Sequence, residues 1–180
     1  VSNIEKNRIS KLDVSVVDEN GNPVPDANVN VKETKADFRW GTSVSQWLVT
    51  GQNNLSTEKG KKDVEMYRKT LLDYFNLAVP ENALKWTLWE DGRQENSRMC
   101  VNWLKDHGIE VKGHALYWDQ PTYSPQKYRA LEYSDPKAYN EIILQHIKDM
   151  AGEFKNEIKL WDGLNECTVN RCILDQLGEG

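Results

Sequence analysis

The sequence predicts an α/β protein built on a parallel sheet. From Phe38 onward, short apolar strands alternate with amphipathic helical stretches, and no repeat or low-complexity segment interrupts them. Strict alternation of this kind requires parallel strands joined by right-handed helical crossovers. The four predicted strands are 38–44, 76–79, 111–118 and 158–164, and the four predicted helices are 61–75, 97–107, 135–154 and 171–177.

Each longer helix has a recognisable pattern or end signal. Helix 61–75 has an apolar stripe at three- and four-residue spacing, formed by Val64, Tyr67, Leu71 and Phe75. Helix 97–107 stops at Gly108, a residue suited to a left-handed C-cap. Helix 135–154 opens with Asp135 and Pro136, a favourable N-cap and first-turn pair.

The N-terminal residues 1–35 follow a different pattern. Apolar residues alternate in 11–17 and again in 27–31, with Asn20-Gly21 between the two runs. This predicts a β-hairpin lead-in, which needs something to pack against because a lone hairpin is marginally stable. The predicted organisation is a hairpin over 1–35 and one α/β domain over 36–180.

Two parallel architectures are open, a doubly wound sheet and a closed barrel. No glycine-rich phosphate loop follows the first strand, so the main sign of a nucleotide-binding sheet is missing. A (β/α)8 TIM barrel takes about 250 residues and eight strand–helix units. The four units of residues 36–180 therefore predict half a barrel, strands 1–4 with their helices.

Composition excludes several classes of partner. The net charge of −5, without basic clusters, argues against nucleic acid and anionic membranes and favours a neutral ligand. No apolar stretch approaches the roughly 20 residues of a membrane span. The three cysteines have no metal-ligand spacing and predict no disulfide framework. His107 and His146 are expected to be structural, one at a helix end and one in the core.

Chemistry in parallel α/β proteins gathers at the carboxyl ends of the strands. Three strand ends carry polar and aromatic residues, and their sequences are PENALKW at 80–86, GHALYW at 113–118 and WDGLNE at 161–166. In the second of these, strand alternation puts His114 and Trp118 on one face, about 13 Å apart along the strand. This pair suits a sugar pocket, and a hydrogen-bonded structural histidine is the alternative. Similarly, Glu81 and Lys85 could form a simple helical ion pair.

Glu166 is the strongest candidate for a reacting group. A carboxyl group here could protonate a glycosidic oxygen while the neighbouring Asn165 amide binds a sugar hydroxyl. Burial beside Trp161 or Trp118 would raise the pKa of Glu166 toward the value that a general acid needs at neutral pH. Alternation places Asn165 and Glu166 on opposite faces, so both can serve one site only if the strand ends or bulges there.

With these three motifs in this order, the sequence resembles glycoside hydrolase family 10, the retaining endo-β-1,4-xylanases, over residues 38–180. It looks closest to the plant-type branch, and the hairpin looks like a lead-in seen before some members. The resemblance implies a secreted xylanase that acts on xylan without a metal or organic cofactor. It implies Glu166 as acid/base, Asn165 on the 2-hydroxyl, and a glycone side lined by Glu81, Asn82, Lys85, His114 and Trp118.

Departures from the family pattern lead to further expectations. Asp119 stands where many members have histidine, and the stretch 89–97 lacks the usual proline and aromatic pattern. The family nucleophile is a glutamate on strand seven, and a retaining mechanism needs that carboxylate about 5 to 5.5 Å from the first. Glu81 and Asp119 are the nearest carboxylates by topology. We therefore expect a fragment that is inactive without the missing C-terminal half of the barrel.

Two other readings compete with the xylanase. One is a non-catalytic or degenerate carbohydrate-binding barrel that kept the sugar contacts. The other is a barrel glycosidase for another β-glycan, because Asn-Glu at strand four is widely shared. An isolated half-barrel would also expose two sheet edges and an apolar face, which predicts aggregation or pairing with another half.

Overall fold

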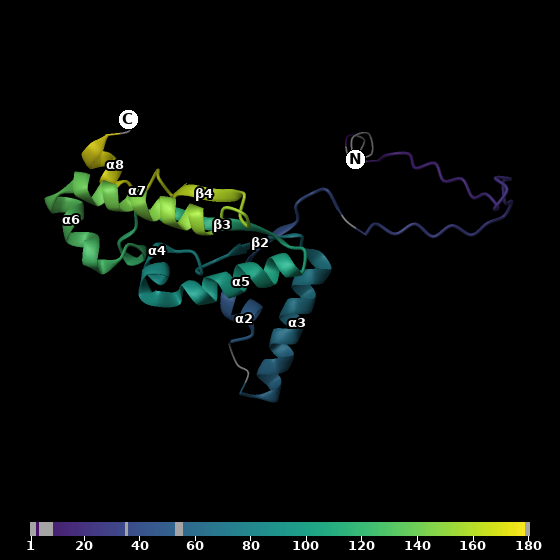
Figure 1. Cartoon of the computed structure of the whole chain (residues 1–180), viewed down its shortest axis with the longest axis horizontal. Coiled ribbons are helices and arrows are strands. Elements are labelled where there is room, and N and C mark those ends of the chain that lie inside the picture. Colours follow the sequence, from purple (N-terminus) through teal and green to yellow (C-terminus); the bar gives the residue numbers. More distant parts are fainter. Residues whose placement is uncertain (1–2, 4–8, 35, 53–55, 179–180) are drawn as a thin grey trace. The chain divides into compact units, whose positions relative to one another are not determined.

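A computed structural model describes residue 3 and residues 9–34, 36–52 and 56–178 of the chain. The chain divides into two units, Val1–Lys35 and Ala36–Gly180 (Figure 1). The second unit contains the sheet and its helices. Among the described residues, no helix combines the length and apolarity needed to cross a bilayer.

The first unit contains the predicted turn without the predicted strand pairing. The Asp18 carboxylate accepts hydrogen bonds from the amides of Asn20 and Asn22, at 2.9 and 2.8 Å. A single antiparallel bridge joins Val17 to Pro23. The predicted pairing of 11–17 with 27–31 is wrong for the described residues, which form no ladder there. The side chains of these runs stay exposed, so pairing the two strands would bury no apolar face.

The second unit confirms the predicted parallel sheet. Its strands follow the order β1–β2–β3–β4 and are β1 (Gly41–Val44), β2 (Leu77–Pro80), β3 (Glu110–Trp118) and β4 (Leu160–Asn165). A doubly wound sheet reverses its strand order at a switch point, whereas this order runs consecutively. The arrangement is therefore that of a partial (β/α) barrel.

At least one helix follows each strand along the chain (Figure 1). The four predicted ones correspond to α3 (Glu58–Tyr74), α5 (Gln94–Asp106), α7 (Pro136–Glu153) and α8 (Cys172–Leu177). The sequence did not predict the short elements α2 (Gln46–Thr50), α4 (Trp86–Leu88), η1 (Trp89–Arg93), η2 (Pro121–Tyr123), η3 (Gln126–Tyr128) and α6 (Arg129–Ser134). Helices this short have too few turns to show an apolar stripe.

The predicted helix ends are confirmed. Asp135 caps α7, because its Oδ1 accepts from the Ala138 amide at 3.1 Å, and Pro136 occupies the first turn. Gly108 follows α5 with a φ of +75°, the left-handed conformation that favours glycine.

Strand β3 supplies the centre of the core. Its residues alternate between buried and partly buried, with Val111, Gly113, Ala115 and Tyr117 on the buried side. Gly113 lies against the Trp161 ring, and a Cβ there would come within 2.1 Å of a ring carbon. His146 on α7 is buried and stacks on Trp86 with ring centroids 4.7 Å apart, which confirms the predicted core histidine. Cys100, Cys167 and Cys172 are free thiols in the structure.

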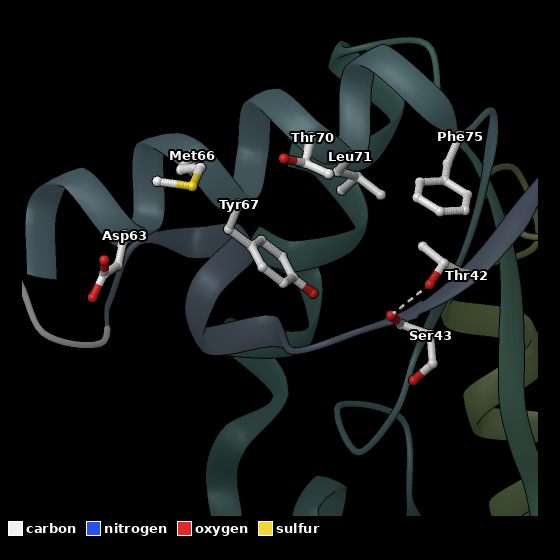
Figure 2. Close-up of a pocket in the computed structure, with 8 residues that line it drawn as sticks. All are labelled: Thr42, Ser43, Asp63, Met66, Tyr67, Thr70, Leu71 and Phe75. Atoms are coloured by element: carbon white, nitrogen blue, oxygen red, sulfur yellow. Dashed lines mark hydrogen bonds between the residues drawn. The ribbon is translucent and has the colours of Figure 1, made fainter.

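At the other end of the sheet, β1 borders an open, largely apolar pocket of about 340 Å³ (Figure 2). Strand β1 and helix α3 contribute its walls, and Tyr67 lies between them, where its hydroxyl accepts from the Ser45 amide at 3.0 Å. The residues that line the pocket are Thr42, Ser43, Asp63, Met66, Tyr67, Thr70, Leu71 and Phe75. Within the described chain β1 pairs only with β2, so this pocket follows a free sheet edge.

Candidate active site

The site lies where β2, β3 and β4 end. These are neighbouring parallel strands, so their carboxyl ends meet at one edge of the sheet. Trp118 Nε1 donates to Glu166 Oε2 at 3.1 Å, and Lys85 Nζ lies 5.1 Å from the centroid of the Trp118 ring. Residues from three separate sequence motifs therefore form one cluster.

Glu166 directly follows the last residue of β4. Its φ of +53° is uncommon outside glycine, and this turn ends the strand. The condition for Asn165 and Glu166 to serve one site is thereby met: Trp118 is in register with Asn165 and bonds to Glu166. Glu166 Oε2 accepts a second hydrogen bond from Asn170 Nδ2 at 2.8 Å.

Glu166 does not have the burial that would favour a general acid at neutral pH. The residue is exposed, because β4 has no neighbour on its other side among the described strands. Trp161 is not its neighbour either. That ring packs over Gly113 and lies 6.5 Å from the Phe154 ring, within the core.

Lys85 is only 7 % exposed and is held by polar and aromatic partners. Its Nζ donates to Asn82 Oδ1 at 2.8 Å and lies 4.1 Å from the centroid of the Tyr123 ring. The alternative of a helical ion pair with Glu81 fails, since Lys85 adopts an extended conformation before α4 and the described residues include no such pair. Glu81 is exposed at the end of β2.

His114 is oriented by a carboxylate. Its Nδ1 lies 2.9 Å from Asp162 Oδ2, and Lys112 Nζ lies 2.7 Å from Asp162 Oδ1. Partial burial alone would raise the pKa of Asp162, but the hydrogen bonds from Lys112 and His114 outweigh it and hold this pKa below its ordinary value. His114 is thus a hydrogen-bonded histidine, and its ring still lies in the cluster, 6.3 Å from Trp118.

This ring separation is about half of the predicted 13 Å between the two residues. The pairing with β4 shifts between His114 and Tyr117, where β3 contains one residue more than its partner. The bulge makes β3 shorter than a regular strand of the same number of residues. In addition, the His114 and Trp118 side chains are long enough for their rings to approach each other.

Sequence reasoning missed Tyr123 of η2. Its ring stacks on Trp118 with centroids 4.5 Å apart and an interplanar angle of 12°. The ring extends the aromatic surface beneath Lys85. The signal available in the sequence was an aromatic residue five positions after Trp118, in a segment that contains two prolines.

Asp119, one of the two carboxylates named as nearest by topology, bonds to partners other than Glu166. The side chain is 8 % exposed and accepts from the Tyr117 hydroxyl at 3.2 Å and from the Ile173 amide at 2.8 Å. Adjacent strand residues point to opposite faces, so Asp119 turns away from the side that Trp118 serves. Burial, with Tyr139 and Asp119 close by, raises the pKa of the Tyr117 phenol.

Together, the consecutive parallel sheet and the polar and aromatic cluster at its carboxyl edge define a barrel protein of the (β/α) class with its site at the strand ends. Comparison with known proteins gives the family. The family model described as "Glycosyl hydrolase family 10" matches residues 32–174, so the chain belongs to glycosyl hydrolase family 10, of whose domain it contains the N-terminal part.

Relatives support this assignment. An endo-1,4-beta-xylanase 5-like protein of Arabidopsis thaliana is 29% identical over 91% of this chain and 27% of its own length. The anti-sigma-I factor RsgI6 of Acetivibrio thermocellus is 26% identical over 98% of the chain and 22% of its own length. The chain thus spans about a quarter of these relatives. Plant and bacterial sequences match at similar identity, so the plant-type branch stays a prediction.

Solved structures agree on the fold. The structure of a GH10 endoxylanase retrieved from sugarcane soil metagenome has a TM-score of 0.57 and 27% identity, covering 73% of this chain and 36% of that one. The catalytic core of xylanase A has the same TM-score, 0.57, at 26% identity. The predicted partial TIM barrel is therefore confirmed.

Proposed function

We propose that this chain supplies the glycone side and the general acid/base of a retaining endo-β-1,4-xylanase. The observation that carries the proposal is the hydrogen bond from Trp118 to Glu166 at 3.1 Å, with Lys85 next to the same ring. It joins a proton-transfer group to an aromatic surface of the kind that binds sugar rings. Among neutral polymers, the family and its relatives favour xylan as the substrate.

Glu166 acts first as an acid and then as a base. Among the described residues, Trp118 and Asn170 both donate to Oε2 of its carboxylate. Oε1 is thus the oxygen that carries the proton to the glycosidic oxygen and later takes one from water. Asn165 holds the sugar 2-hydroxyl, and Glu81, Asn82, Lys85 and His114 bind the other hydroxyls on the glycone side.

We further propose that the nucleophile lies outside these 180 residues. A retaining mechanism needs a second carboxylate about 5 to 5.5 Å from the acid/base. Asp119 turns to the opposite face, and Asp162 is paired with Lys112 and His114. The chain by itself is then expected not to turn over xylan, and its partner is the C-terminal half of a barrel. Residues 1–35 are a lead-in segment, and the protein is secreted.

Binding tests this function without requiring turnover. Titration of the chain with xylotetraose, followed by calorimetry, should show binding that Trp118→Ala weakens at least tenfold, about 1.4 kcal/mol. Trp40→Ala is the matched control. Trp40 is 55% exposed and directly precedes the amino end of β1, whereas the candidate site lies at the carboxyl ends of the strands. Equal losses in both variants, or no xylotetraose binding, would count against the xylan site. Tighter binding of cellotetraose would point to another β-glycan.

A carbohydrate-binding barrel without catalysis is the second candidate. The exposed position of Glu166 favours it, because a general acid is usually shielded from water. An aryl β-xylobioside, which has an activated leaving group, distinguishes catalysis from binding alone. The assay uses a protein that joins this chain to the proposed C-terminal half of the barrel. Release of the aryl group that Glu166→Ala slows supports the enzyme, and binding without release supports the binder.

A further inference from the structure

The end of β3 contacts the segment after β4 from both faces of the sheet. On one face, Trp118 donates to the Glu166 carboxylate at 3.1 Å. On the other, the next residue, Asp119, accepts from the Ile173 amide at 2.8 Å. The segment that carries Glu166 is therefore tied at both of its ends to one dipeptide.

Asp119 takes the place of a helix cap that α8 lacks. Arg171 stands at the N-cap position of α8 and makes no side-chain cap hydrogen bond. The first amides of a helix have no partner within the helix, and Ile173, which lies in the first turn, is only 6% exposed. The carboxylate that satisfies this buried amide comes from a residue 54 positions earlier in the chain.

Side-chain packing contributes little to the position of residues 167–169. Cys167 and Thr168 are exposed, and Val169 is 79% exposed. A cavity of about 180 Å³ lies beneath the segment, bordered by Asp119, Cys167, Asn170 and Ile173 among others. Because side-chain packing is sparse here, polar contacts decide where the segment lies.

One of those contacts reaches Glu166. Asn170 donates through Nδ2 to Glu166 Oε2 at 2.8 Å, and its backbone amide bonds to the Glu166 carbonyl at 2.9 Å. Asn170 stands three residues before Ile173, so the start of α8 and the Glu166 carboxylate are separated by a short stretch of chain.

We propose that Asp119 is a positioning residue for Glu166, which it holds in place by capping α8 at Ile173 and thereby fixing Asn170 against the carboxylate. The mechanistic meaning rests on the proposed role of Glu166 as acid/base. The physical coupling does not, and it can be measured on this chain without substrate.

The indole Nε1–H resonance of Trp118 reports the coupling. In the ¹⁵N-labelled chain this resonance is assigned with Trp118→Phe, and Glu166→Ala gives its position when the hydrogen bond is absent. We expect Asp119→Ala to move the resonance most of the way to the Glu166→Ala position. Asp119→Asn should leave it near the wild-type position, since the Asn side-chain oxygen still accepts from the Ile173 amide. Asp149→Ala, which removes a carboxylate paired with Gln145 on α7, is the control and should leave it unchanged.

The indole resonance of Trp86, which is only 3% exposed, shows whether each variant is folded. If Asp119→Ala does not fold, Asn170→Ala replaces it and should produce the same displacement. The proposal is overturned if the folded variant keeps the wild-type Trp118 resonance. It is equally overturned if Asp119→Asn moves the resonance as far as Asp119→Ala, because loss of charge would then explain the effect. The two proposals can fail separately. If the unmodified chain does not bind xylotetraose but Asp119→Ala still displaces the Trp118 resonance, only the proposed function is overturned.

Discussion

Strands β3 and β4 are neighbours in one sheet, yet they are held differently. Val111, Ala115 and Tyr117 of β3 are at most 4% exposed, whereas Leu160 and Leu164 of β4 are 37% and 53% exposed. The sugar-binding candidates near β3 thus lie on a packed frame, while Glu166 lies on a segment held by hydrogen bonds. The candidate binding surface is thus fixed by packing, and the position of the Glu166 carboxyl group depends on a few polar contacts.

The largest effect is expected when one glycine is replaced by alanine in β3 and, for comparison, one in β4. In Gly113→Ala, the new methyl group would lie 2.1 Å from the Trp161 ring, so the ring must leave its place. We expect a loss of about 3 kcal/mol in the free energy of unfolding, measured with urea. Gly163→Ala on β4 meets nothing within 4 Å and should change stability by less than about 0.5 kcal/mol. Similar losses in both variants would contradict the difference in packing.

The stability of the packed core should depend on pH through His146, which is buried on α7. Burial lowers the pKa of this histidine from 6.5 to about 4, so the folded state favours the neutral ring. Between these values the unfolded state binds the proton and the folded state does not. Stability should therefore fall as the pH drops from 6.5 to 4, by about 2 to 3 kcal/mol from this group.

The variant His146→Gln isolates that contribution. Urea unfolding at several pH values should show a shallower decline for the variant over this interval, because all other titrating groups are shared. Equal slopes for the two proteins would show that His146 is not the group responsible.

The same substitution, valine to alanine, can be compared on β3 and in the segment after β4. Val111 on β3 is 1% exposed, and its replacement by alanine should cost about 2 kcal/mol of unfolding free energy. Val169 in the segment after β4 is 79% exposed, and the same change should cost less than about 0.5 kcal/mol. A larger loss at Val169 would mean that the segment is packed after all.

The smallest expected effect concerns helix caps. Helix α7 has its own cap in Asp135, whereas α8 takes its cap from Asp119. Asp135→Ala should lower the free energy of unfolding by about 1 kcal/mol through the lost hydrogen bond to the Ala138 amide. Exposed Lys137 lies two residues further on, and Lys137→Ala serves as the control. Equal stability of the two variants would argue against the cap.

The longer elements could be predicted because their signals are local. The apolar stripe of α3, the Asp135-Pro136 start of α7 and the Gly108 end of α5 all appear as predicted. The hairpin failed because strand pairing depends on a partner that buries its apolar face, and alternation alone does not provide one. Short elements such as α4 and η2 were missed because their conformation comes from tertiary contacts.

The sequence predicted which residues form the candidate site better than it predicted how they are arranged. Motifs at strand ends identified Lys85, His114, Trp118 and Glu166, and the structure brings them to one edge of the sheet. It also shows an exposed Glu166, an added ring in Tyr123, and an Asp119 that turns to the other face. Glu166 is exposed because β4 has no further neighbour among the described strands. Tyr123 and Asp119 have their positions through contacts with Trp118 and Ile173, which no local pattern predicts.

By itself, the sequence determined the alternation of strands and helices and the residues at the strand ends, since periodicity and capping act within a few residues. The tertiary structure alone decided which partners those residues have. The bond from Asp119 to Ile173 spans 54 positions and the bond from Trp118 to Glu166 spans 48. Contacts at such separations exist only once the parallel strands have aligned, because the alignment brings distant parts of the chain to the same edge of the sheet.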